Sequence, residues 1–265
     1  MNEVAKIKIE DAAGLKNAIK KAVGQIGGFG KFINKGETAL LKPNFNTADP
    51  FPASSDPRFL QAVVELVYET GAGEVLLGDS STMAVKTRKV MQELGIFELE
   101  KLNPAPKIIV FDEERWVKNK IPEGKYLKTA SLPEILQKID KLILLPCLKT
   151  HFIAQFTGSL KISVGFMKPR ERIHLHMSYT QEKIAELSTL IKPDLIIMDA
   201  RKCFIAGGPS DGKLAEPGLI LASDSRVAID KEGIKIIQSF ENNCLAGINP
   251  KDMPQIKRAI ELGIK

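Results

Sequence analysis

The three histidines of the chain, His151, His174 and His176, fall close together in the sequence. A neutral imidazole can bind a metal ion, and its pKa also suits it to proton transfer near neutrality. His174 and His176 face opposite ways in an extended segment and diverge in a helix, so at most one of them should point into a cleft. The alternative is structural: His151 would cap a strand end, and the other two would lie on a solvated loop.

Basic residues concentrate in the same part of the chain. Those between residues 161 and 172 are Lys161, Lys168, Arg170 and Arg172, against the single acid Glu171. Nucleic-acid binding needs a basic face with stacking aromatics, whereas this short patch suits a small anion better. We therefore predict that Lys149, Lys161 and Arg170 neutralise a small anionic ligand.

The run Thr157-Gly158-Ser159-Leu160-Lys161 is typical of a turn that enters a helix. Free backbone N–H groups at such a turn can hold a phosphate or a carboxylate, which makes Thr157 and Gly158 candidate ligand contacts. The run lacks the spacing of a Walker A loop. An ordinary helix start with a surface lysine is the alternative interpretation.

Polar residues follow several other apolar runs. Lys42 and Asn44 follow the run Ala39–Leu41, Asp79 follows Glu74–Leu77, and Thr150 follows Lys141–Leu145. The Gly207-Gly208 pair belongs to a glycine-containing loop that allows close backbone approach to a ligand, although a structural turn is an equal alternative. Asp79 could equally bind a metal or cap the next helix.

Two kinds of nucleophilic chemistry are disfavoured. Ser80 lies in GDSS, which lacks the GxSxG elbow of the α/β hydrolases. Cys147 precedes His151 by four positions at a strand end, a spacing that does not ensure contact between a thiolate nucleophile and a histidine base. Most lone cysteines are simply buried. The three cysteines also lack the close spacing of zinc or iron–sulfur sites, so we expect neither a disulfide framework nor an intrinsic cluster.

Short β-rich runs alternate with helical patterns along the chain, which predicts an α/β fold with a mostly parallel sheet covered by helices. The predicted strands are Val4–Ile9, Ala39–Leu41, Glu74–Leu77, Lys107–Phe111, Lys141–Leu145, Leu195–Met198 and Leu219–Ala222, with shorter ones at Arg115–Lys118 and Tyr126–Ser131. The predicted helices are Asp11–Ile26, Pro57–Thr70, Met83–Leu94, Thr180–Ile191 and Ser225–Phe240.

The polar residues above stand at the carboxyl ends of predicted strands. Ligands of open α/β sheets bind in the crevice outside those ends, so we expect the side chains to converge there. Residues 1–265 are predicted to form one α/β unit without a separate ferredoxin domain. The irregular stretch 103–133 is the candidate boundary between two lobes that would share this cleft.

Composition and charge narrow the class of protein. The chain has 44% hydrophobic and 26% charged residues and a net charge of +6, with acids and bases interspersed along most of its length. No signal peptide and no apolar run long enough to cross a bilayer is apparent. The sequence thus predicts a cytoplasmic protein that binds neither nucleic acid nor a membrane.

Several blocks together resemble the family known as domain of unknown function 362. They are LLKPNFN, SDPRFLQAVVELVYETGAGEVLLGDS, LLPCLKTH, TGSLKISVGFM, KPDLIIMDA, GGPSDG and ASDSRVAID, in the family's order. Many members carry a separate cysteine-rich ferredoxin segment, which is missing here. The resemblance therefore implies an external electron-transfer protein as a partner and does not imply an intrinsic iron–sulfur cluster.

A more distant resemblance is to the nickel-pincer lactate racemases, on His151, Gly158, Lys161, Gly165 and a histidine at 174 or 176. It implies that His151 transfers protons, that Lys161 attaches a nickel-pincer cofactor, and that His176 binds the metal. The full glycine-rich signature of the racemases and much of their C-terminal lobe are missing from this chain.

The preferred functional hypothesis is an enzyme that binds a small anion or a nucleotide-like cofactor between strand ends, with isomerase or redox chemistry. Lys42 and Asn44 would orient the ligand and His151 would act as acid or base. The alternative is a non-catalytic carrier or a module that docks a ferredoxin-like partner through its basic surface. The substrate and the oligomeric state do not follow from the sequence.

Overall fold

A computed structural model describes residues 3–9 and 14–265 and has a ten-stranded sheet at its centre. The main path of the sheet runs β1 (Ala5–Lys8), β12 (Leu219–Ser223), β10 (Leu195–Gly207), β7 (Lys141–Leu144), β2 (Thr38–Lys42), β3 (Glu74–Asp79) and β4 (Lys107–Val110). Every neighbour from β10 to β4 is paired in parallel, whereas β1, β12 and β10 pair antiparallel. The fold is thus the predicted α/β class with a largely parallel sheet.

Both faces of the sheet are buried because alternate side chains of its central strands enter two different cores. On β2, Leu40 joins one core, whereas Ala39 and Leu41 join the other. Ile143 on β7 likewise points away from its neighbour Leu144. Full burial of each such aliphatic side chain contributes about 1.5–3 kcal/mol, which explains why these strands are apolar throughout.

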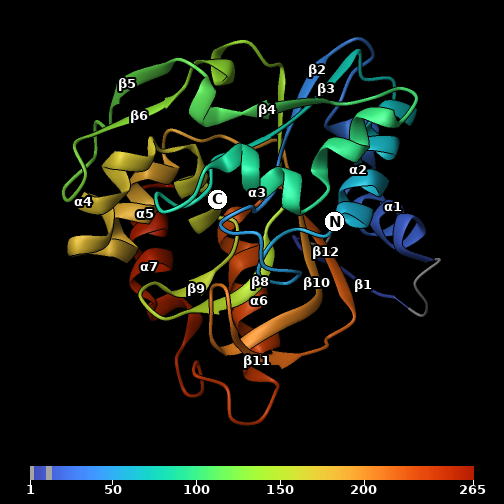
Figure 1. Cartoon of the computed structure of the whole chain (residues 1–265). Coiled ribbons are helices and arrows are strands. Elements are labelled where there is room, and N and C mark those ends of the chain that lie inside the picture. The colour runs from blue at the N-terminus through green and yellow to red at the C-terminus, as the bar shows by residue number, and fades with distance from the viewer. Residues whose placement is uncertain (1–2, 10–13) are drawn as a thin grey trace.

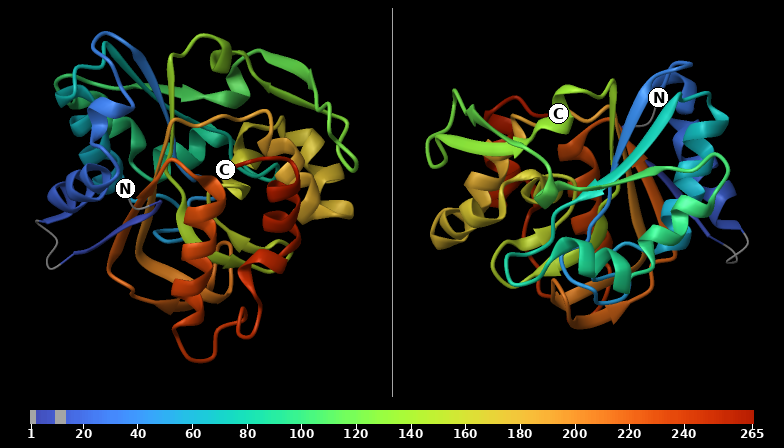
Figure 2. Two further views of the ribbon diagram at one scale, coloured as in Figure 1. Left: turned by 180° about the vertical axis from the view of Figure 1, so that it is seen from behind. Right: turned by 45° about the horizontal axis from the view of Figure 1, so that its top comes forward.

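Helices cover both faces (Figures 1 and 2). The first group is α1 (Leu15–Gln25), α2 (Pro57–Glu69) and α3 (Thr87–Glu93). The second is α4 (Arg172–Met177), α5 (Thr180–Ser188), α6 (Arg226–Gln238) and α7 (Pro254–Glu261). The predicted start of α2 is confirmed: the Asp56 side chain accepts a hydrogen bond from the N–H of Arg58, and Pro57 occupies the first turn.

Shorter elements extend the sheet beside the carboxyl ends of the parallel strands. β8 (Cys147–His151) pairs with the far end of β10 and with β9 (Gln155–Thr157), while β11 (Gly212–Ala215) folds back on β10. The 3₁₀ helix η6 (Lys161–Phe166) follows β9. β5 (Trp116–Lys120) and β6 (Thr129–Pro133) form a separate two-stranded sheet.

All seven main predicted strands are present, but β10 continues to Gly207, nine residues beyond the predicted end at Met198, and the other ends differ by at most two residues. The predicted helix start at Asp11 lies outside the described residues, and the described helix begins at Leu15. Residues 103–133, the predicted lobe boundary, contain β4 at the edge of the main sheet and the β5–β6 ribbon. The division into two lobes stays a prediction. Among the described residues, no helix is both long and apolar enough to cross a membrane.

Candidate functional site

Two adjoining chambers open where the parallel strands end. The inner chamber is small, about 50 Å³, and is lined mainly by polar and charged side chains from β2, β3, β8, β9, η6 and α4. The outer chamber is about 440 Å³ and lies between the loop after β3, the loop after β8, and α4. Asn46, Lys161, Val164, Arg172 and Pro209 line both chambers, so the two share a wall.

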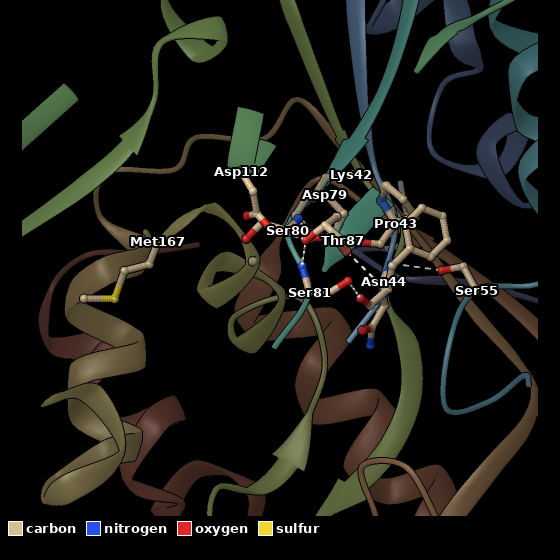
Figure 3. Close-up of polar contacts among 12 residues, drawn as sticks. Lys42, Pro43, Asn44, Ser55, Asp79, Ser80, Ser81, Thr87, Asp112 and Met167 are labelled. Atoms are coloured by element: carbon tan, nitrogen blue, oxygen red, sulfur yellow. Dashed lines mark hydrogen bonds and ion pairs between the residues drawn. The ribbon is translucent and has the colours of Figure 1, made fainter. Parts of the chain in front are cut away.

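The ends of β2 and β3 lie side by side at the inner chamber (Figure 3). Lys42 Nζ lies 2.6 Å from Asp79 Oδ1 and donates to the carbonyl of Pro43 at 2.8 Å. The Asp79 carboxylate also accepts the N–H groups of Phe45 and Ser80, at 2.7 and 2.6 Å. Burial lowers the pKa of Lys42 and raises that of Asp79, and their mutual contact opposes both changes.

Gly165 on η6 allows this ion pair to form. A Cβ atom at residue 165 would lie 2.5 Å from Lys42 Nζ and 2.6 Å from Asp79 Oδ1. Both separations are too short for a carbon atom, so the backbone of η6 can approach the pair only with glycine at this position.

Lys149 and Lys161 bring further positive charge to the inner chamber. Lys149 is buried on β8 and donates to the carbonyls of Pro52 and Ala53. Burial lowers its pKa to about 8. Burial, together with the nearby cations Lys149 and Arg172, lowers the pKa of Lys161 to about 7. Among the described residues, Lys161 Nζ has no hydrogen-bond or ion-pair partner.

Arg172, the first residue of α4, fixes the wall between the chambers. Its guanidinium donates to the carbonyls of Ser81 at 2.6 Å and Gly165 at 3.2 Å, and to the Ser80 hydroxyl. Its Nε donates to the carbonyl of Met167 at 2.8 Å. These bonds tie α4 and η6 to the end of β3. Burial lowers the pKa of Arg172 to about 10, so the side chain stays charged at neutral pH.

The turn at residues 157–160 is filled by a carboxylate of the protein itself. Asp230 on α6 accepts the N–H groups of Ser159, at 2.5 Å, and Leu160, at 2.9 Å. These two backbone N–H groups are therefore already used within the protein and are not free to bind an anion. Thr157 contributes differently: its buried hydroxyl lines the inner chamber and has no partner within the described chain.

His151 lines the outer chamber as a neutral imidazole. Its Nδ1 accepts the N–H groups of Ile153 at 3.1 Å and Ala154 at 3.2 Å, so the ring proton must be on Nε2. Burial, together with the nearby side chains of Lys161, His176 and Lys149, lowers its pKa to about 2. In this state His151 can donate a hydrogen bond through Nε2, whereas taking up a proton would break both backbone contacts.

His176 has the opposite tautomer. Its Nδ1 lies 2.7 Å from the carbonyl oxygen of Arg172, which can only accept, so Nδ1 carries the proton and Nε2 keeps its lone pair. Burial lowers the pKa of His176. Its ring lines the outer chamber together with His151, whereas His174 on the same helix is exposed. Of these two histidines, His176 is the one that lines the chamber.

The structure brings together most of the predicted site residues. Those that line one or both chambers are Lys42, Asn44, Asp79, Lys149, His151, Thr157, Lys161 and His176. Those that line neither chamber are Thr150, Gly158, Arg170, Gly207 and Gly208. Arg170 is exposed, because it lies in the 3₁₀ turn that precedes α4. Gly208 packs its backbone against β8, where its carbonyl accepts from Phe152 at 3.3 Å.

Sequence reasoning placed Arg172 in the basic patch and did not select it. The available signal was its spacing from His176: residues four apart lie on one face of a helix. That pattern places Arg172 and His176 together at the cleft and turns His174 away. Asn46 and Ser80 also line the inner chamber.

A metal ion would find few protein ligands in this cleft. Among residues 3–9 and 14–265, no group of three or more histidine, cysteine, aspartate or glutamate side chains could hold one. Cys147 and Cys203 are buried and Cys244 is exposed, and all three are free thiols. Burial raises the pKa of Cys147 to about 11, so this thiol is not a nucleophile at neutral pH.

Comparisons with known proteins agree with this architecture. A family model described as Domain of unknown function (DUF362) matches residues 39–235. A thylakoid-associated protein of Synechocystis is 26% identical over 262 residues, which cover 96% of this chain and 77% of that protein.

Two solved structures share the fold at 12% sequence identity, which is too low to indicate more than the fold. One is a structural-genomics crystal structure of a Thermotoga maritima protein, with a TM-score of 0.53, covering 87% of this chain and 59% of that one. The other is the lactate racemase apoprotein of Thermoanaerobacterium thermosaccharolyticum, with a TM-score of 0.52, covering 84% and 55%. The chain thus spans less than two thirds of either structure.

Proposed function

The chain belongs to the DUF362 family, and from this premise we propose that it is an enzyme that binds a small anion in the inner chamber and moves a proton on it. The family match and the shared fold are compatible with an enzyme-like role. The anion would be a carboxylate or a phosphate group, because the chamber of about 50 Å³ admits only a small head group.

One observation carries the proposal: cationic side chains from four elements converge on one cavity. They are Lys42 on β2, Lys149 on β8, Lys161 on η6 and Arg172 on α4. In the described chain, Asp79 is the single carboxylate that lines this chamber, and it is already paired with Lys42. Unpaired buried cations are unfavourable, so an incoming anion would relieve a penalty that the free protein carries.

The two histidines would divide the proton chemistry. His176 would be the base, because Nε2 has a lone pair while Nδ1 is fixed by the Arg172 carbonyl. His151 would be a neutral hydrogen-bond donor through Nε2 and would stabilise negative charge that develops on the substrate. This assignment revises the acid–base role predicted for His151, because its Nδ1 is occupied by two backbone donors.

A cofactor of the nickel-pincer type is compatible with two of these groups. The Lys161 amine is free of partners in the described residues and is partly neutral near pH 7, as covalent attachment requires. With such a cofactor bound, the Nε2 atom of His176 would bind the metal instead of acting as a base, and further ligands would come from the cofactor because the described residues supply no cluster there. When bound, such a group would supply metal-centred redox chemistry.

Anion binding by the whole 265-residue chain tests the core of this proposal. Calorimetric titration with acetate, oxalate and inorganic phosphate should show one site that Lys161→Met weakens by at least tenfold. The matched control is Lys168→Met, because Lys168 is exposed and close in sequence but lies outside both chambers. Equal binding by the two variants would contradict the proposed site.

The docking alternative predicts the reverse dependence. A module that recognises a ferredoxin-like partner through its basic surface should respond to the exposed residues Lys168 and Arg170 and to salt, and should tolerate Lys161→Met. A ferredoxin titration of the Lys168→Met and Lys161→Met variants, at low and at high salt, distinguishes the two functions.

A further inference from the structure

The outer chamber has an unusual rim. The described residues include nine exposed large hydrophobic side chains, and five of these line the outer chamber: Met83, Phe152, Ile153, Ile173 and Met177. Phe152 and Met177 are 74% and 72% exposed. Single exposed apolar side chains are ordinary on a protein surface, whereas a concentration around one cavity marks a binding surface.

The rim adjoins the cationic chamber directly. Lys161 and Arg172 line both chambers, so a ligand whose charged end lies between these cations must extend past them into the apolar chamber. Thr157, whose buried hydroxyl has no hydrogen-bond partner within the described residues, also lines the inner chamber. Charge complementarity therefore fixes which end of a ligand is inside and which is outside.

We propose that the site takes an amphipathic organic acid, with its carboxylate in the inner chamber and an apolar body of several carbons against Phe152, Ile173 and Met177. This inference rests on the proposed function and names its substrate class. It disfavours polyphosphates and free sugar phosphates, whose charged or hydroxylated parts would have to occupy the apolar rim without hydrogen-bond partners.

The volumes of the chambers support this orientation. The inner chamber of about 50 Å³ holds a carboxylate and little more, while the outer chamber of about 440 Å³ lies within the range of sites for small organic ligands. His151, whose Nε2 is a donor, and His176, whose Nε2 keeps its lone pair, both line the outer chamber. The reacting atoms would therefore be those close to the carboxylate, at the boundary between the chambers.

A chain-length series of free carboxylates tests the inference on the unmodified protein. Competition or calorimetric titration with acetate, butanoate, hexanoate and octanoate should show affinity rising about fourfold for each buried methylene until the chamber is full. The same affinity for acetate and hexanoate would overturn the apolar part of the inference and leave the anion site intact. Failure of every anion to bind would instead overturn the proposed function as well.

Variants of the rim residues test whether these side chains cause the dependence of affinity on chain length. Met177→Ser combined with Phe152→Ser should abolish the dependence on chain length and leave acetate affinity within about twofold. Leu214→Ser is the matched control, because Leu214 is exposed and apolar but lies on β11, outside both chambers. If the control loses the dependence as well, the rim is not the site.

A membrane is the competing occupant of the rim, and a second measurement separates it from a free acid. Sedimentation with vesicles of phosphatidylglycerol and phosphatidylcholine should leave the protein in the supernatant. Rim-dependent binding to these vesicles, without affinity for free hexanoate, would overturn the inference in favour of a membrane contact.

Discussion

Replacing Lys161 by methionine should stabilise the free protein while it weakens anion binding. The ammonium group lies in a largely buried position beside the cations Lys149 and Arg172, and within the described residues it has no carboxylate or carbonyl partner. Methionine has a similar length and no charge, so it fills the same space and removes the penalty of desolvation. A residue that destabilises the fold is typical of a binding site that awaits its ligand.

The expected size follows from the pKa of Lys161, which falls from 10.5 to about 7. Because each pKa unit corresponds to 1.36 kcal/mol, the folded state loses at most about 4 kcal/mol at pH 7 relative to an unperturbed lysine. Part of the side chain still contacts solvent. We therefore expect a gain of about 1–2 kcal/mol in the free energy of unfolding.

The pH dependence of this stabilisation gives a sharper test than its magnitude. Since the folded-state pKa lies below the unfolded value, the penalty is fully present below about pH 7, shrinks as pH rises, and vanishes above 10.5. The stabilisation by Lys161→Met should shrink in the same window, as measured by urea unfolding from pH 6 to pH 9.5. Lys168→Met serves as the exposed control. A destabilised variant, or a gain that is constant across this range, would show that Lys161 carries no desolvation penalty in the folded protein.

Three further predictions concern the same cleft. Anion affinity should fall as pH rises above 7, by up to tenfold per unit, because binding requires protonated Lys161; calorimetry in buffers of different ionisation enthalpy should show proton uptake. Gly165→Ala should weaken anion binding and lower stability by about 1–3 kcal/mol, because the new methyl displaces Lys42; titration and urea unfolding measure both. Asp230→Asn should lower stability by about 2–4 kcal/mol in urea unfolding, because it leaves Arg226 without its nearby charge, whereas Asp211→Asn should not.

The sheet could be predicted from the sequence because its strands are buried on both faces. A strand such as β7 has aliphatic residues at every inner position, and that pattern depends on local composition alone. The strands β8, β9 and β11 were not predicted. β8 contains Lys149 and His151 at buried positions, and β9 has only three residues, so neither has the apolar pattern of a core strand.

The cleft could be placed from the sequence because polar residues follow the parallel strands. That rule located Lys42, Asp79 and Lys149 correctly at one edge of the sheet. That rule could not show which nearby polar groups were already hydrogen-bonded within the protein. The turn at Gly158 was predicted to bind an anion, yet it is occupied by Asp230, a residue of a helix some 70 positions later in the chain. Hydrogen-bond pairing over such a separation leaves no local signature in the sequence.

The turn at residues 157–160, which Asp230 occupies, and the buried lysines Lys149 and Lys161 have one physical consequence for anion binding. Because the backbone donors at residues 159 and 160 are already used by Asp230, they cannot offer an anion a fixed charge that is independent of pH. The charge must come from side chains: Arg172 stays charged at neutral pH, whereas burial holds Lys161 and Lys149 at pKa values of about 7 and 8. An arriving carboxylate raises both values, so ligand binding and protonation favour each other. A site built in this way takes up an anion together with a proton.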